Sequence, residues 1–225
     1  MQKHSLYCSR SHTYREDVTF STTLLPALTG LATGLALIVA IGSQNAFVLR
    51  LGISGRRRTV LPVVLVCALS DAVLITAGAV GVGAVVESAP AALVVVRVLG
   101  ALFLLTYGVL AARSALRPSA MTPDDGASVP IGVAVTTALA LTWLNPHVYL
   151  DTVVFLGSVA NQQGADERWW WVGGAIAASV VWFFALGFGA RLLRPVFARP
   201  RSWQVLDALI AVVMVTLGIR MALGA

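Results

Sequence analysis

The stretch ALTWLNPHVYLDTVVF, residues 140–155, lies inside a long apolar run, yet it holds an Asn-Pro pair, a histidine, a tyrosine and an aspartate. Pro146 lacks a backbone N–H and its ring clashes with the carbonyl group one turn earlier, so a helix through this run is interrupted there. Backbone groups freed inside a membrane are tolerated only where they face protein or a water-filled cavity. The stretch therefore predicts a broken membrane helix beside a polar cavity.

The composition of the whole chain points to a lipid bilayer. Of the 225 residues, 58% are hydrophobic and only 12% are charged, about half the charged share of a typical soluble domain. The apolar runs are near the roughly 20 residues of a spanning helix and are too long for the alternating strands of a membrane barrel. They cover residues 24–50, 59–84, 90–112, 129–159, 169–190 and 203–223. We predict an all-α integral membrane protein with six transmembrane helices.

Arginines in the loops predict how the chain is oriented. Short loops rich in Lys and Arg stay in the cytoplasm. The first, third and fifth loops carry this excess, as Arg50, Arg56, Arg57 and Arg58, then Arg113 and Arg117, then Arg191, Arg194, Arg199 and Arg201. We therefore expect the odd-numbered loops inside and both termini outside. Because topology accounts for these arginines, the net charge of +6 does not indicate a nucleic-acid partner.

Two of the six runs are too long for one straight span. Runs 24–50 and 129–159 would form helices of roughly 42 and 46 Å, against a hydrocarbon core of about 30 Å. The second run contains the Asn-Pro break. The first contains its own weak point, IGSQNAF at residues 41–47, where Gly42 and Ser43 precede two amides. We expect both runs to be broken helices.

The two broken runs cross the membrane in opposite directions in this orientation, and each leads one half of the chain. That arrangement is typical of transporters built from inverted repeats. It predicts one membrane domain over residues 24–224, with repeat one at 24–113, repeat two at 129–224 and a cytoplasmic linker at 114–128. Residues 1–23 lack the apolar stretch of a signal peptide and are expected to form a disordered tail.

Two aspartates are the strongest candidates for function. Asp71, in the stretch CALSDAVLI, falls near the middle of the second span, where an ionised carboxylate costs about 2.5–3.5 kcal/mol on insertion scales. Asp151 lies four residues after His147, so the two share a face if the helix resumes after the break. The alternatives are a structural, hydrogen-bonded Asp71 and an Asp151 that is simply hydrated at the outer interface. We expect both carboxylates to line one cavity.

Uncharged polar groups flank both breaks, namely Gln44, Asn45, Asn145 and Tyr149. Such side chains either bind a ligand in the cavity or cap the broken backbone, and the two roles can coexist.

Other polar or aromatic residues have simpler interpretations. Trp169–Trp171 predicts an aromatic belt at the membrane interface. Asp207 is expected to stabilise the first turn of the last helix. Cys8 and Cys67 give neither a disulfide framework nor metal-ligand spacing. The sequence contains no cluster of metal ligands and no nucleophile–base array, so we expect no metal, no cofactor and no enzyme activity.

Three motifs resemble those of the LysE/ArgO family of lysine and arginine exporters. They are GSQNAFVLRLGI at 42–53, CALSDAVLI at 67–75 and, most specifically, TWLNPHVYLDTVVFLGS at 142–158. The similarity covers essentially residues 24–224 and is absent from the tail. Relatives that export homoserine or threonine share the Asn-Pro feature but not the whole string NPHVYLD. The resemblance implies a multi-pass protein of the bacterial inner membrane.

By this resemblance, Asp71 and Asp151 correspond to an intramembrane acidic pair of the family. Gln44, Asn45, Asn145 and Pro146 match its two signature breaks. The chain departs from the family at Ser43, where the family usually has proline.

The expected function is secondary export of L-lysine or L-arginine. A cationic side chain in a low-dielectric cavity requires a carboxylate partner. The N-termini of the half-helices at the breaks are expected to hold the carboxylate of the amino acid. Proton antiport would offset the cost of expelling a cation, about 2.3 kcal/mol per 100 mV. So short a transporter is compatible with a homodimer.

Two other functions remain open from the sequence. One keeps the fold and exports a neutral amino acid or a metal cation. The mid-membrane carboxylates disfavour a neutral cargo, and the lack of Cys, Met or clustered His at the site disfavours soft metals. The other is a membrane scaffold that transports nothing, which would not require paired broken helices with polar faces.

Overall fold

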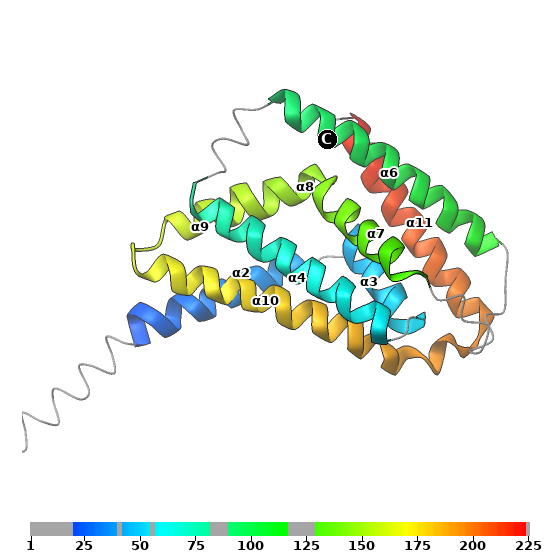
Figure 1. The fold of residues 1–225 in the computed structure, drawn as a ribbon, viewed down its shortest axis with the longest axis horizontal. Coiled ribbons are helices and arrows are strands. Elements are labelled where there is room, and N and C mark those ends of the chain that lie inside the picture. The colour runs from blue at the N-terminus through cyan, green and yellow to red at the C-terminus, as the bar shows by residue number, and fades with distance from the viewer. Residues whose placement is uncertain (1–19, 40–41, 55–56, 82–89, 117–128, 224–225) are drawn as a thin grey trace, which may run out of the picture.

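The structure, a computed structural model, describes residues 20–39, 42–54, 57–81, 90–116 and 129–223. Within these ranges every regular element is a helix, which confirms the predicted all-α class (Figure 1). The elements are η1 (Phe20–Leu24), α2 (Leu25–Ile38), α3 (Ser43–Ser54), α4 (Arg57–Ala79), α6 (Pro90–Leu116), α7 (Ile131–Trp143), α8 (Pro146–Val148), η2 (Tyr149–Leu156), α9 (Gly157–Asn161), α10 (Glu167–Gly189), η3 (Ala190–Leu193), η4 (Val196–Ala198) and α11 (Pro200–Leu223).

Parts of the predicted organisation lie outside the described residues. These parts are most of the tail, residues 1–19, and most of the linker, residues 117–128. The end of the tail is helical, because the first helix begins at Phe20, before the expected start at residue 24.

Several of the described helices are long and apolar enough to cross a bilayer. Four qualify singly, at Arg57–Ala79, Arg97–Leu116, Glu167–Leu193 and Arg201–Leu223. Two more candidates are bent pairs. Thr22–Ile38 and Ser43–Ser54 meet at 84°, and Ile131–Trp143 and Pro146–Asn161 meet at 59°. Counting each pair as one span gives six, the number predicted from the sequence.

Both predicted breaks occur in the structure. In the first run, helix α2 ends at Ile38 and α3 begins at Ser43. In the second run, α7 ends at Trp143 and Pro146 begins α8, a position where the missing N–H is not needed. The wider π-helical turn η2 that follows was not predicted.

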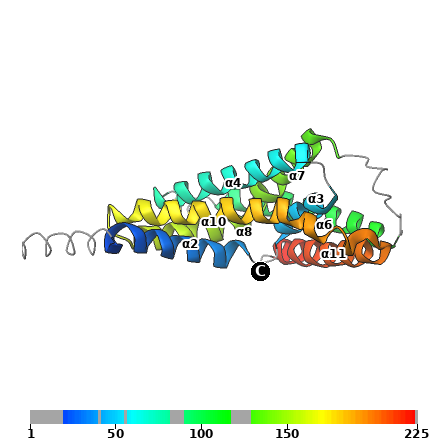
Figure 2. The same ribbon diagram turned by 90° about the horizontal axis from the view of Figure 1, so that it is seen from below.

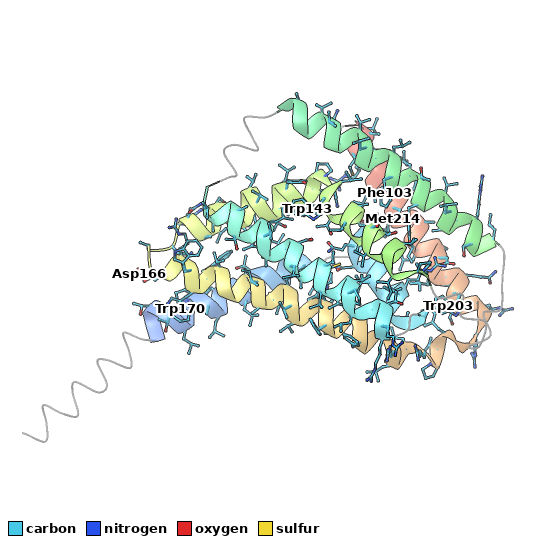
Figure 3. The ribbon with its side chains drawn as sticks, in the orientation of Figure 1. Phe103, Trp143, Asp166, Trp170, Trp203 and Met214 are labelled. Carbon is cyan, nitrogen blue, oxygen red and sulfur yellow. The ribbon has the colours of Figure 1, made fainter. Side chains whose placement is uncertain are left out.

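The helices pack through small residues. Helix α2 lies along α10, and α6 lies along α11 (Figures 1 and 2). Gly174 of α10 faces Ala27 of α2, and a Cβ added there would overlap with the Ala27 carbonyl group. Phe103 and Met214, labelled in Figure 3, mark the contact between α6 and α11. Close approach of backbones through small residues is the usual way in which membrane helices associate.

The predicted tryptophan belt is only partly correct. Trp169 and Trp170 are 48% and 52% exposed, as expected at an interface, but Trp171 is only 1% exposed. The helical period turns this third ring away from its neighbours and into a core cluster that includes Ile75 and Leu156, and the Trp171 backbone lies against Gly30 of α2. Trp170 and Trp203 lie at opposite ends of the molecule (Figure 3).

The prediction that Asp207 stabilises the first turn of the last helix is wrong, because α11 begins at Pro200 and has no acidic residue in its first turn. The Asp207 side chain is buried and lies 2.7 Å from an Nη atom of Arg50 on α3. The Ser114 hydroxyl of α6 donates a second bond to it, at 2.6 Å. A buried carboxylate needs such partners to remain charged. This group therefore ties α3, α6 and α11 together.

The contact between α2 and α10 can be tested with two adjacent glycines. Gly174→Ala should lower the melting temperature of the detergent-solubilised protein, because overpacking of this kind costs about 1–3 kcal/mol. Gly173→Ala is the matched control, since a Cβ there meets nothing within 4 Å. Equal melting temperatures for the two variants would contradict the close packing of α2 on α10.

Candidate functional site

A cavity of about 390 Å³ lies between the two broken helices. Its volume falls within the range of small-molecule sites, roughly 300–1,000 Å³. Residues of α2, α3, α4, α8, η2, α10 and α11 line it. The cavity therefore exists because two helices stop and change direction where a straight helix would fill the space.

Most of the residues singled out from the sequence come together in this cavity. Those that line it are Gly42, Ser43, Gln44, Asn45, Asp71, Asn145, His147 and Asp151. Pro146 and Tyr149 are not among the lining residues. Two segments about 100 residues apart in the sequence thus contribute to one site, and both aspartates belong to it.

Asp71 is the buried carboxylate of the cavity. It lies on α4, and the residue is only 7% exposed. The Ser179 hydroxyl of α10 donates a hydrogen bond to Asp71 Oδ2 at 2.7 Å. The bond partly replaces the water that the carboxylate lost on burial. It leaves Oδ1 without a hydrogen bond among the described residues.

Asp151 is the more open carboxylate. Its side chain is 45% exposed, and Oδ2 lies 2.8 Å from Nδ1 of His147, whose side chain is 50% exposed. The two residues share a helix face, as their spacing predicted. The cavity therefore offers a deep carboxylate held by a hydroxyl and a shallow one paired with an imidazole.

Two of the predicted polar residues cap the broken backbone. Asn45 Nδ2 donates to the carbonyl oxygen of Ile38, the last residue of α2, at 2.6 Å. The Tyr149 hydroxyl donates to the carbonyl oxygen of Trp143, the last residue of α7, at 2.9 Å. Trp143 marks this junction in Figure 3. At each break, a side chain of the following segment thus satisfies a carbonyl that the helix has left free.

The partners of these capping groups lie on neighbouring spans. Asn45 Oδ1 accepts a hydrogen bond from Trp182 Nε1 of α10 at 3.1 Å. Trp143 Nε1 donates to the Ser70 hydroxyl of α4, also at 3.1 Å. Asn145 caps the short helix α8 by accepting from the His147 N–H at 3.1 Å. Each break is therefore held by a hydrogen bond within its own broken helix and by a second hydrogen bond to a neighbouring helix.

Two donors at the start of α3 lack a strong partner of this kind. Ser43 Oγ and Gln44 Nε2 are buried; Ser43 Oγ makes no hydrogen bond within the described ranges, and Gln44 has the thiol of Cys67, a weak acceptor, beside its amide. Both residues line the cavity. Buried polar groups are usually paired, so these two are free to bind a ligand.

Sequence reasoning missed three residues of the site. Ser179 and Trp182 lie in an apolar run on α10, and no pattern in that run indicates which face meets α4 or α3. Arg220 of α11 is an exposed residue that lines the cavity. Within the described ranges its side chain makes no hydrogen bond or ion pair. In the sequence, Arg220 is indicated only by its charge near the end of the last apolar run.

The lining of the cavity offers charged and polar groups that could bind a solute. Among the described residues, no three His, Cys, Asp or Glu side chains come together as metal ligands. The lining combines two carboxylates, one guanidinium and several amide and hydroxyl groups with apolar walls. Such a lining suits a small solute that carries charges of both signs.

Comparison with known proteins relates this chain to a family of translocators. The LysE type translocator family matches residues 35–225. A putative amino-acid transporter of Mycobacterium bovis is 52% identical over 182 residues, which cover 80% of this chain and 89% of that protein. The lysine exporter LysE of Corynebacterium diphtheriae is 37% identical, covering 87% of this chain and 97% of the exporter. The arginine exporter protein ArgO of Serratia proteamaculans is 42% identical, covering 87% and 95%. No solved structure matches.

Substitutions at the first break should separate its two hydrogen bonds. Asn45→Ala leaves both the Ile38 carbonyl and Trp182 Nε1 without a partner, and each unpaired buried group costs about 1–3 kcal/mol. Trp182→Phe removes the second bond alone. We expect the melting temperature to fall further in Asn45→Ala than in Trp182→Phe. A wild-type melting temperature in Asn45→Ala would show that this side chain does not hold the break.

Proposed function

The chain belongs to the LysE type translocator family, and we propose that it is a secondary exporter of L-lysine or L-arginine in the bacterial inner membrane. One observation carries the choice of cargo, namely that Asp71 and Asp151 line the same cavity. The names of the relatives, a lysine exporter and an arginine exporter, favour the same cargo.

The charges of the cavity fit a cationic amino acid. L-Lysine and L-arginine each carry two positive groups, an α-ammonium and a side-chain cation. Two carboxylates can pair with both, and a guanidinium binds a carboxylate through two parallel hydrogen bonds. A neutral amino acid has one positive group and would leave one carboxylate of the cavity unpaired. The cavity has one carboxylate more than a neutral amino acid can pair with, so the neutral cargo is disfavoured.

The mechanism we propose uses two inverted repeats, residues 24–113 and 129–224, within one domain over residues 24–224. Exchange of the two halves maps several contacts onto one another. Helix α2 packs on α10 as α7 packs on α4, and α3 packs on α10 as η2 packs on α4. Alternating access would then come from rocking one repeat against the other.

The contact between α6 and α11 also supports this symmetry. Gly108 of α6 faces Val215 of α11, and Gly218 of α11 faces Leu105 of α6. Exchanging the two halves of the chain maps each of these contacts onto the other. In the proposed orientation the odd-numbered loops face the cytoplasm and both termini lie outside.

Proton antiport is the coupling that we propose. A carboxylate of the cavity releases its proton in order to bind the cationic substrate from the cytoplasm. On the outer side the substrate leaves, and a proton takes its place on the carboxylate. One proton enters for each cation expelled, so the exchange moves no net charge against the membrane potential.

Asp71→Asn tests the cargo. The substitution keeps the hydrogen-bonding shape but removes the charge, so efflux of radiolabelled arginine and lysine from dipeptide-loaded cells should fall to the background. Asp166→Asn is the matched control, since Asp166 is an exposed residue at the end of the molecule (Figure 3). Membrane abundance should be unchanged in both variants. Undiminished efflux from Asp71→Asn would reject the role of the carboxylate.

The coupling is tested in proteoliposomes loaded with arginine and a pH-sensitive dye. With the protein oriented as in the cell, substrate efflux should acidify the lumen, because protons enter as the cation leaves. Liposomes without protein provide the baseline. Efflux without acidification would exclude proton antiport but would not contradict the proposed cargo.

A further inference from the structure

The N-terminus of α3 presents buried hydrogen-bond donors to the cavity. The residue Ser43 is 1% exposed, and its Oγ has no partner within the described ranges. Gln44 Nε2, next to it, is likewise buried, with the thiol of Cys67, a weak acceptor, beside it. Within the described residues, the backbone ladder of α3 begins with the bond from the Ala46 N–H to the Gly42 carbonyl oxygen, at 3.1 Å. The N–H groups of residues 43 and 44 precede this first bond.

The chemistry of this helix terminus is that of an anion site. Backbone N–H groups at the start of a helix carry partial positive charge and point out along its axis. Hydroxyl and amide donors beside them add hydrogen bonds to the same ligand. A buried donor without a partner costs free energy, and a bound anion would remove that cost.

The second break does not offer an equivalent site. Helix α8 is only three residues long and begins with Pro146, which has no N–H. The N–H of His147 is already bound to the Asn145 side chain at 3.1 Å. Of the two breaks, the first is therefore the one that presents buried donors to the cavity within the described residues.

We propose that Ser43, Gln44 and the N-terminus of α3 bind the α-carboxylate of the transported amino acid. The inference rests on the proposed function, since it assigns one end of the same cargo. The carboxylate lies at the first break, and the two cationic groups turn toward Asp71 and Asp151. The site thereby selects amino acids over amines that carry the same side chain.

Arg220 is the rival for this role, because it lines the same cavity and its guanidinium also suits a carboxylate. Two observations favour the first break. Arg220 is exposed, whereas the donors of Ser43 and Gln44 are buried. Arg220 also lies in the last turn of α11, where a cation stabilises a helix C-terminus without any ligand.

The test compares efflux of L-arginine and L-argininamide from proteoliposomes of the full-length protein. Argininamide keeps both positive groups but has an uncharged amide in place of the carboxylate. The wild type should prefer arginine. Ser43→Ala should lower arginine efflux by about 10–100-fold and leave argininamide within about twofold, as expected for one lost bond to a charged group. Gln44→Leu should change efflux in the same direction.

Ser54→Ala is the matched control, since Ser54 is exposed at the far end of α3 and, among the described residues, its hydroxyl bonds only to the Arg50 carbonyl oxygen. It should behave as the wild type. If Ser43→Ala is not recovered folded, Ser43→Gly replaces it, because glycine also lacks the hydroxyl donor and adds no atoms to the site. The same loss of preference is expected.

Each other result overturns the inference. A wild type that exports argininamide as well as arginine needs no carboxylate subsite. Equal loss of both substrates in Ser43→Ala would show a structural role. Loss of the preference in Arg220→Gln but not in Ser43→Ala would assign the carboxylate to Arg220. A wild type that exports neither arginine nor lysine would instead reject the proposed function itself.

Discussion

The rest of this structure depends on two backbone carbonyl groups that lose their helical partners at the breaks. When α2 ends at Ile38 and α7 ends at Trp143, each terminal carbonyl needs a donor that lipid cannot supply. Asn45 and Tyr149, from the segments that follow, provide these donors. The capping bonds hold each pair of half-helices at an angle, and the space between the two bends is the cavity. The cavity is thus a consequence of how the backbone is hydrogen-bonded at the two breaks.

The two carboxylates of the cavity have different surroundings. Asp71 is buried and held by one hydroxyl, whereas Asp151 is nearly half exposed and paired with His147. A deep acid and a shallow acid in one cavity give a cation two successive partners. The two donors at the start of α3 face the same space and suit the opposite charge. In the proposed function, such an arrangement would orient an amino acid that carries charges of both signs rather than merely attract a cation.

The sequence was most informative where a residue has a strong local effect. Pro146 and the polar cluster after Gly42 located both breaks, because proline and amides disturb a helix wherever it packs. The spacing of His147 and Asp151 predicted their contact, since residues four apart always share a helix face. Partners on other helices could not be predicted. Ser179, Trp182 and the contact of Arg50 with Asp207 depend on how each helix is rotated about its axis, which an evenly apolar run does not specify. The inverted repeat remains a prediction from topology.

The most direct measurement of the central claim is efflux of L-arginine against L-citrulline from proteoliposomes of the wild-type protein. Citrulline has nearly the same shape as arginine but a neutral ureido group in place of the guanidinium. If two carboxylates select a cationic side chain, arginine should leave at least about tenfold faster, the equivalent of roughly 1.4 kcal/mol. Equal efflux of the two would show that the cavity does not recognise the side-chain charge, and would contradict selection of the cargo by Asp71 and Asp151.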